Sequence, residues 1–91
     1  MAHSQKISKD NLMRLLIEHG ILEGIRIGRY DPVVQSDAPA RKIQGGRSLV
    51  ISYYYGNQYV CTKHELKTKR DGVVHQDVED VFINGIRYER E

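Results

Sequence analysis

The feature that most constrains the fold is a pair of runs rich in β-branched residues and tyrosine on either side of Gly56-Asn57. Glycine followed by asparagine suits a two-residue turn with positive φ, which matches the twist of two antiparallel strands. The sequence therefore predicts a hairpin with strands Ser48–Tyr55 and Gln58–Leu66. Because the turn also sets the register, Tyr54 is expected to lie opposite Tyr59.

This register divides the side chains of the hairpin between two faces of a sheet. The face expected in the core carries Leu49, Ile51, Tyr53, Val60, Thr62, His64 and Leu66. Tyr54 and Tyr59 belong to the opposite face, where they are either exposed or covered by another surface. Cys61 is expected to be a small buried strand residue, and a single cysteine excludes a disulfide within the chain.

Ahead of the hairpin, the segment Ser8–His19 predicts an amphipathic helix. Ser8 can cap the first turn, and leucines recur at helical spacing until Gly20, which suits the left-handed position after a helix. This helix is the natural cover for the core face of the hairpin. The segment Gly24–Tyr30 alternates apolar with polar or glycine residues, which is typical of a strand.

Three segments are less regular. Residues 1–7 are polar and predict a flexible N-terminus, and residues 33–47 contain proline, glycine and few apolar groups, which favours a long loop. For the segment after Gly72 two interpretations remain. One is a short helix Asp77–Ile83 followed by a strand Ile86–Tyr88, which we favour slightly; the other is a tight hairpin around Asn84-Gly85.

Together these elements predict one α+β domain spanning residues 1–91, a three- to four-stranded mainly antiparallel sheet with one or two helices packed on one face. A domain of 91 residues has a thin core, so we expect self-association as a homodimer that buries Tyr54 and Tyr59. The polar N-terminus and the short apolar runs indicate a cytoplasmic protein without a membrane span.

Charge is distributed unevenly along the chain, although the net charge is only +2. Residues 41–70 carry seven basic groups against one acidic group, whereas residues 71–91 carry two basic groups against six acidic ones. A basic patch of Lys63, Lys67, Lys69 and Arg70 near exposed tyrosines suits phosphate neutralisation and base stacking, hence RNA or DNA. The alternatives are ordinary solvated faces, or complementary patches that dock within or between chains.

His64 is the residue best placed to carry chemistry. It could act as a general acid or base at a strand end, with Arg70 or Lys67 stabilising charge and Tyr55 or His75 as a second proton carrier. These are the groups that metal-free RNA cleavage needs. The alternative is a half-buried strand histidine bonded to backbone. Since the four histidines and the carboxylates show no metal-ligand spacing, neither a metal nor another cofactor is expected.

The segment from His64 to Gly85, with Arg70-Asp71-Gly72, Asp77-Val78 and Asn84-Gly85, resembles small bacterial domains related to ribonuclease toxins of toxin–antitoxin systems. Asp71 stands where that family has arginine. The resemblance implies a helix at Asp77 and a connection with RNA. The resulting hypothesis is a small nucleic-acid-associated, toxin-like domain; its rival is a non-catalytic protein-interaction or inhibitor module that acts through the tyrosine-rich face.

Overall fold

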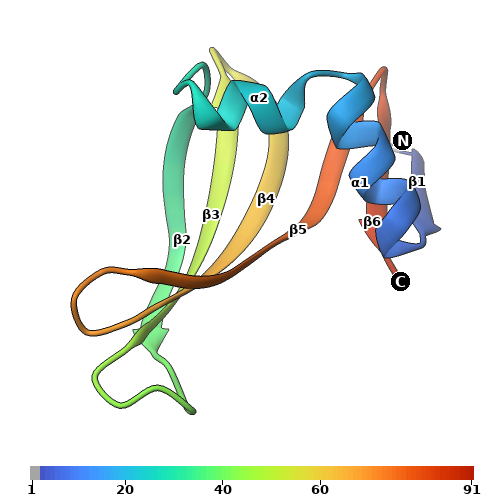
Figure 1. The fold of residues 1–91 in the computed structure, drawn as a ribbon. Helices are drawn as coiled ribbons and strands as arrows, with labels where there is room; N and C mark the ends of the chain where they lie inside the picture. The colour runs from blue at the N-terminus through green and yellow to red at the C-terminus, as the bar shows by residue number, and fades with distance from the viewer. Residues whose placement is uncertain (1–2) are drawn as a thin grey trace.

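The computed structural model describes residues 3–91, which form one six-stranded sheet and two helices (Figure 1). The strands are β1 (His3–Ile7), β2 (Asp31–Pro39), β3 (Arg47–Tyr55), β4 (Gln58–Lys67), β5 (Val73–Ile83) and β6 (Ile86–Arg90), and the helices are α1 (Lys9–Glu18) and α2 (Ile21–Arg26). The strand order is β1-β6-β5-β4-β3-β2, and only the β1–β6 pair is parallel. The predicted fold, a three- to four-stranded sheet with helices packed on one face, is therefore wrong, because a six-stranded sheet makes up most of the molecule and both helices are short.

Helix α1 confirms the predicted N-terminal helix and both of its ends. The Ser8 hydroxyl accepts a hydrogen bond of 3.2 Å from the backbone N–H of Asn11, and Gly20 has a φ of 68°. The packing partner was predicted wrongly, because α1 lies mainly against β5 and β6 rather than against the β3–β4 hairpin. It is the short helix α2 that extends over the upper ends of β3 and β4 (Figure 1).

Helix α2 replaces the strand predicted at Gly24–Tyr30. Ile21 and Ile25 are four residues apart and share a helical face, and Glu23 receives a 2.9 Å hydrogen bond from Arg26 Nε. Gly24 is buried against the ring of Tyr30, which leaves no space for a Cβ atom there. A short apolar run fits either periodicity, and here the helical packing prevails.

Strands β1 and β2 form the two edges of the sheet, and both lie in segments expected to be irregular. His3–Ile7 belongs to the predicted flexible N-terminus yet pairs with β6, while residues 1–2 lie outside the described part of the chain. β2 occupies much of the predicted loop at 33–47 and is exposed along its whole length. An edge strand has one strand neighbour and little to bury, so its proline-flanked, polar sequence resembles that of a loop.

The β3–β4 hairpin confirms the predicted strands and the turn at Gly56-Asn57, but not the register beyond it. Tyr54 pairs with Tyr59 as expected, and then a bulge at Val60 places Cys61 opposite Tyr53. One extra residue exchanges the two faces of a strand. The β4 residues turned toward the helices are therefore Cys61, Lys63 and Glu65 instead of the predicted Thr62, His64 and Leu66.

Strand β5 shows that the favoured helix Asp77–Ile83 is wrong and that the alternative hairpin around Asn84-Gly85 is right. A second bulge explains the error. β4 pairs with Val78 and then with Asp80, which leaves Glu79 as the extra residue. Val78 and Val81 consequently both face the core at a spacing of three, and this spacing imitates one face of a helix.

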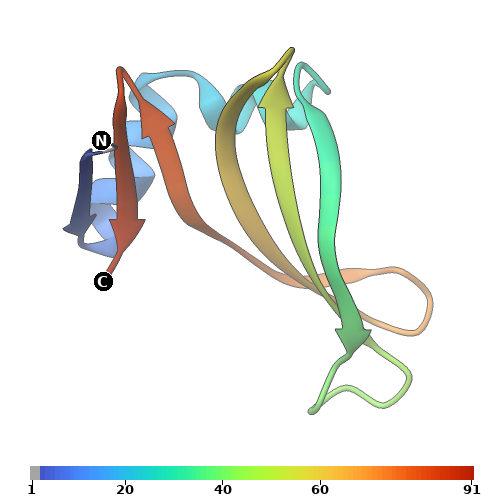
Figure 2. The same ribbon diagram turned by 180° about the vertical axis from the view of Figure 1, so that it is seen from behind.

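The core lies between the helices and one face of the sheet. It comprises Leu12, Leu16, Ile21, Leu49, Ile51, Tyr53, Val60, Cys61, Val78 and Val81. Cys61 is fully buried, as predicted, and burial raises the pKa of its thiol to about 12. Seen from behind, the opposite face of the sheet has no helix over it, and the loops that follow β2 and β4 project away from the helices (Figure 2).

Candidate nucleic-acid interface

Two loops meet at the projecting end of the sheet. The loop between β2 and β3 is closed by backbone hydrogen bonds of 3.0 Å from Ala40 to Gly46 and of 2.9 Å from Gly46 to Ile43. The loop between β4 and β5 is a tight turn in which Thr68 donates a 2.8 Å backbone hydrogen bond to Gly72. Backbone hydrogen bonds thus fix the conformation of both loops.

The two loops also pack on each other. Gly46 is buried, and a Cβ atom at this position would lie 2.6 Å from the Lys67 carbonyl oxygen and equally close to the Ile43 side chain. The aliphatic stem of Lys69 lies over Gly45. Because this approach needs glycine, the sequence Gly45-Gly46 holds the two loops side by side.

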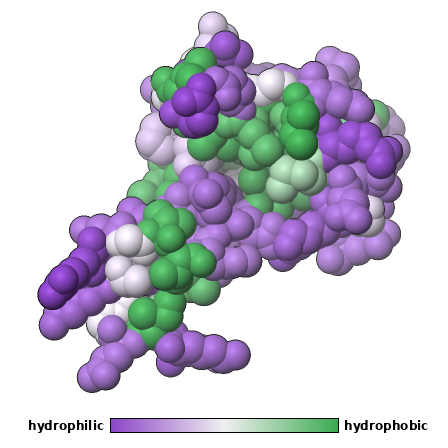
Figure 3. Space-filling model, in the orientation of Figure 1, coloured by the Kyte–Doolittle hydropathy of each residue, from purple (hydrophilic) through white to green (hydrophobic). Residues whose placement is uncertain are grey.

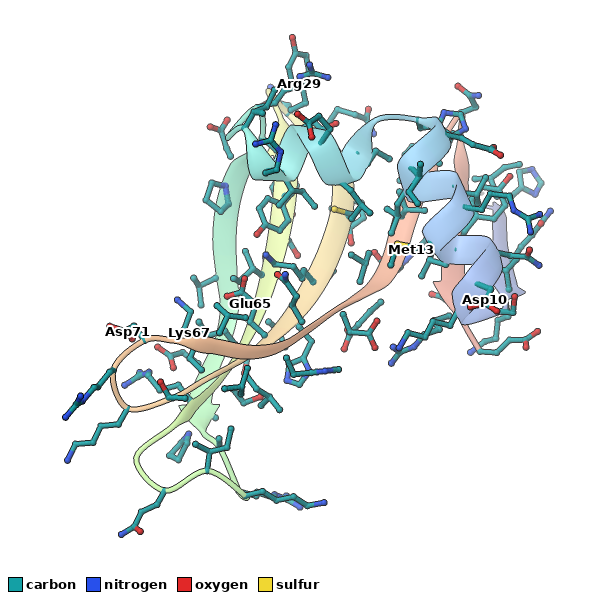
Figure 4. All side chains as sticks on the ribbon, in the orientation of Figure 1. Asp10, Met13, Arg29, Glu65, Lys67 and Asp71 are labelled. Atoms are coloured by element: carbon teal, nitrogen blue, oxygen red, sulfur yellow. The ribbon has the colours of Figure 1, made fainter. Side chains whose placement is uncertain are left out.

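Cations dominate both loops. The cationic side chains at this end, which we call the basic tip, are Arg41, Lys42, Lys67, Lys69 and Arg70. All except the half-buried Lys67 are exposed. Within the two segments 40–46 and 68–72, Asp71 is the one acidic residue. Figure 4 shows Lys67 and Asp71 at this projecting end, and in Figure 3 the extremities of the same end are hydrophilic, with a hydrophobic band between them.

Arg47, at the base of the tip, is neutralised within the protein. Its Nε donates a 2.8 Å hydrogen bond to Asp37, and a second guanidinium nitrogen binds the other carboxylate oxygen. The hydrogen bond to Asp37 raises the pKa of Arg47, and the same bond lowers the pKa of the Asp37 carboxyl. The paired groups therefore add little to the positive field of the tip.

The acidic tail of the chain pairs elsewhere in the molecule. Asp80 accepts hydrogen bonds from Arg87, Glu89 lies near Lys6, and Asp77 forms an ion pair with Arg90. These contacts join β5 and β6 with each other and with β1. Three of the six acidic residues of the tail, Asp77, Asp80 and Glu89, are thus paired away from the basic tip.

The predicted basic patch is brought together only in part. Lys67, Lys69 and Arg70 lie at the tip, but Lys63 is 8% exposed and faces the helices, because the bulge in β4 reverses its direction. Sequence reasoning missed Arg41 and Lys42 as partners of this patch. The signal was present, since strands paired on either side of a hairpin turn carry their outer loops to one end.

The three predicted catalytic residues do not share a site. His64 is half-buried in the middle of the sheet, where its Nε2 lies 2.7 Å from the Ser48 hydroxyl. Arg70 is at the basic tip, whereas Tyr55 is at the opposite end of β3, which has nine residues. A strand of this length separates its ends by about 26 Å.

The predicted interface tyrosines are cross-strand neighbours on the outer face. The rings of Tyr54 and Tyr59 form an edge-to-face pair with centroids 5.6 Å apart, and both residues are half-buried. The Tyr59 hydroxyl is hydrogen-bonded to Thr62 and to Asp80. Burial and the hydrogen bond to Asp80 raise the pKa of Tyr59. We therefore assign this hydroxyl a structural role, in which it links β4 to β5.

Two general findings concern the part of the chain from His3 to Glu91. Neither helix combines the length and the apolar character needed to cross a membrane. No three side chains of His, Cys, Asp or Glu among these residues lie together in a way that could hold a metal ion.

Comparison with known proteins adds no assignment. The chain matches no protein-family model, and neither a curated protein nor a solved structure shows significant similarity to it. Function is therefore argued from the geometry of the site.

Proposed function

We propose that this protein binds nucleic acid through the basic tip, and that it does so through the phosphate backbone. The observation that carries the proposal is the pair of ordered loops that places Arg41, Lys42, Lys69 and Arg70 at one projecting end. Clustered Lys and Arg side chains displace the counterions that surround nucleic acid, and this supplies binding free energy without reading sequence.

Backbone contact is favoured over base stacking by the position of the aromatic residues. The segments 40–46 and 68–72 contain no aromatic residue, and Tyr53, Tyr54 and Tyr55 occupy the other end of β3. Binding of single strands relies on aromatic side chains on which bases stack. The tip lacks such platforms, so the preferred ligand is a duplex, bound with little dependence on base sequence.

The proposal includes no cleavage step. Metal-free RNA cleavage needs an acid, a base and a charge-stabilising group within hydrogen-bonding reach of one substrate. His64, Arg70 and Tyr55 are distributed along the length of the sheet, and His64 is engaged by Ser48. What remains of the toxin-like hypothesis is affinity for nucleic acid.

Fluorescence anisotropy with labelled duplex and single-stranded RNA and DNA, repeated at several salt concentrations, tests the proposal. We expect duplex binding to weaken steeply with salt, because each phosphate contact adds about 0.9 to the slope of log affinity against log salt. The double variants Arg41→Ala/Lys42→Ala and Lys69→Ala/Arg70→Ala should each lower that slope by up to about 2.

A matched control is available on helix α1, where Lys9 and Arg14 are exposed. The variant Lys9→Ala/Arg14→Ala removes the same charge but leaves the tip intact, so its salt slope should stay at the wild-type value. Equal losses in the control and tip variants would indicate a nonspecific effect of net charge and contradict the assignment of the site.

The rival function, a protein-interaction or inhibitor module, is supported by a different surface. The outer face of the sheet, with Tyr54 and Tyr59, has no helix over it among the described residues (Figure 2). Tyrosine is enriched in protein interfaces. If no nucleic acid binds in a salt-dependent way, this face becomes the better candidate.

A further inference from the structure

A hollow of about 520 Å³ lies between the helices and the sheet, at a distance from the basic tip. Met13, Leu22 and Ile25 line it from α1 and α2, and Lys63, Gln76 and Val78 line it from β4 and β5. Met13 projects from α1 toward the strands (Figure 4), and hydrophobic side chains gather beside the helices on the same face (Figure 3). The volume is in the range of small-molecule sites.

Lys63, one of the polar residues that line this hollow, is held in a buried ion pair with Glu65, which lies outside the lining. Lys63 Nζ lies 2.6 Å from a carboxylate oxygen of Glu65, and the two side chains are only 10% and 9% exposed. The ammonium also lies 5.4 Å from the centre of the Tyr53 ring. Burying two charges costs solvation free energy, and a buried charged group with a specific partner in a cleft is a candidate for a functional site.

The charges around the hollow cancel in pairs. Lys63 is matched by Glu65, Arg26 at the rim is bonded to Glu23, and the rim carboxylate of Asp77 is paired with Arg90. An ionic ligand would have to separate one of these pairs. A neutral ligand would not.

One contact in the hollow is easily exchanged. The ammonium of Lys63 reaches the exposed Gln76 side chain at 3.4 Å, which is long for a hydrogen bond. A ligand oxygen can take the place of the Gln76 oxygen and accept this bond, while the amide nitrogen of Gln76 becomes available as a second donor.

We propose that this hollow binds a neutral, mainly apolar small molecule that carries one carbonyl or hydroxyl oxygen. The apolar body packs against Met13, Leu22, Ile25 and Val78, and the oxygen accepts hydrogen bonds from Lys63 and Gln76. This site is separate from the basic tip and does not depend on nucleic-acid binding.

Three probes of nearly equal shape test the proposal: benzylacetone, which has a carbonyl group; hydrocinnamate, which has a carboxylate; and butylbenzene, which has no acceptor. Each is titrated into the protein while the methyl signals of Met13, Leu22, Ile25 and Val78 are followed by proton–carbon correlation NMR. We expect saturable shifts with benzylacetone, at an affinity about tenfold higher than that of either other probe.

Two variants on one helix locate the binding. Met13→Trp fills the hollow and should abolish the shifts, whereas Ile17→Trp adds the same side chain at a position that is 62% exposed and outside the lining, and should leave them unchanged. The double variant Lys63→Met/Glu65→Met removes the ion pair without leaving one charge alone. Because Gln76 remains as the only donor, this variant should retain only a small part of the native preference for benzylacetone over butylbenzene.

Absence of saturable shifts in the native protein would overturn the proposal, and so would equal affinity for all three probes. Tighter binding of hydrocinnamate would overturn the neutral-ligand assignment. If the double variant does not fold, the probe series and the two tryptophan variants still decide the outcome.

Discussion

Lys63 and Glu65 form an ion pair among the apolar side chains that α1 and α2 cover. Burial works to lower the pKa of Lys63, but Glu65 and the Tyr53 hydroxyl outweigh it and raise that pKa, so the ammonium stays charged. A pair of this kind contributes little to stability compared with two apolar residues of equal size. We therefore relate the pair to the ligand site proposed above.

Removing one partner of the Lys63–Glu65 ion pair should lower the free energy of unfolding more than removing both partners. We expect Lys63→Met to lower the free energy of unfolding by about 3 kcal/mol, since the carboxylate of Glu65 is left buried and alone. The double variant Lys63→Met/Glu65→Met should regain most of that loss. Urea denaturation of the native protein, the two single variants and the double variant gives the coupling, and additive effects of the single changes would contradict it.

Stability should fall in alkaline solution because of Cys61 and Tyr59. Burial raises the pKa of the Cys61 thiol from 9.0 to about 12, and the pKa of Tyr59 is also raised. Between pH 9 and pH 12 the unfolded chain therefore loses protons that the folded chain retains, so rising pH favours unfolding. The loss is at most about 1.4 kcal/mol per pH unit for each group.

Chemical denaturation at several alkaline pH values measures this dependence. Cys61→Ala should flatten the slope of unfolding free energy against pH, even though it lowers stability at neutral pH. A slope unchanged by this substitution would show that the thiol is not involved.

At the scale of the elements, two β-bulges determine which side chains meet. The bulge at Val60 turns Lys63 and Glu65 toward the helices, and the bulge at Glu79 brings Val78 and Val81 to the core face together. Without the first bulge, Lys63 would lie on the outer face and the hollow would lose its cation. Bulges of this kind often redirect side chains at functional sites.

The contact between the two loops of the basic tip depends on Gly46. Gly46→Ala places a methyl group 2.6 Å from the Lys67 carbonyl oxygen, so the loops must separate. We expect a loss of about 1–3 kcal/mol in unfolding free energy and weaker binding to duplex nucleic acid. Denaturation measures the stability, and fluorescence anisotropy measures the binding. The control Gln44→Ala, at an exposed position in the same loop, should leave both quantities unchanged.

At the scale of the whole molecule, one layer of sheet is covered by helices on one side only. The uncovered outer face carries the Tyr54–Tyr59 pair. Together with the thin core of a 91-residue chain, this arrangement supports the proposal of a two-fold dimer formed through that face.

Light scattering across a range of protein concentrations tests the dimer. Tyr54→Glu should give the mass of a monomer, because two like charges would be buried at the centre of the interface. Tyr55→Glu, in the same hairpin but 63% exposed, should leave the mass of the dimer unchanged. A monomer mass for the unmodified protein at all concentrations would refute the dimer.

By itself the sequence determined the features that depend on neighbours along the chain. The cap at Ser8, the left-handed Gly20 and the turn at Gly56-Asn57 are each specified by a few adjacent residues, and all three are found in the structure. The basic character of the middle of the chain was also visible, because it requires only counting charges.

Only the tertiary structure decided where strands bulge, which strands are edges and which loops adjoin. Three features depend on pairing between segments far apart in sequence: the burial of Lys63, the strand at Asp31–Pro39 and the packing of the loop at 40–46 on Lys67 and Lys69. A single inserted residue reverses every later side chain in a strand, and an edge strand has little apolar surface to bury. The periodicity of a segment predicts neither its bulges nor its position at the edge of a sheet, because both depend on hydrogen bonds to a partner strand.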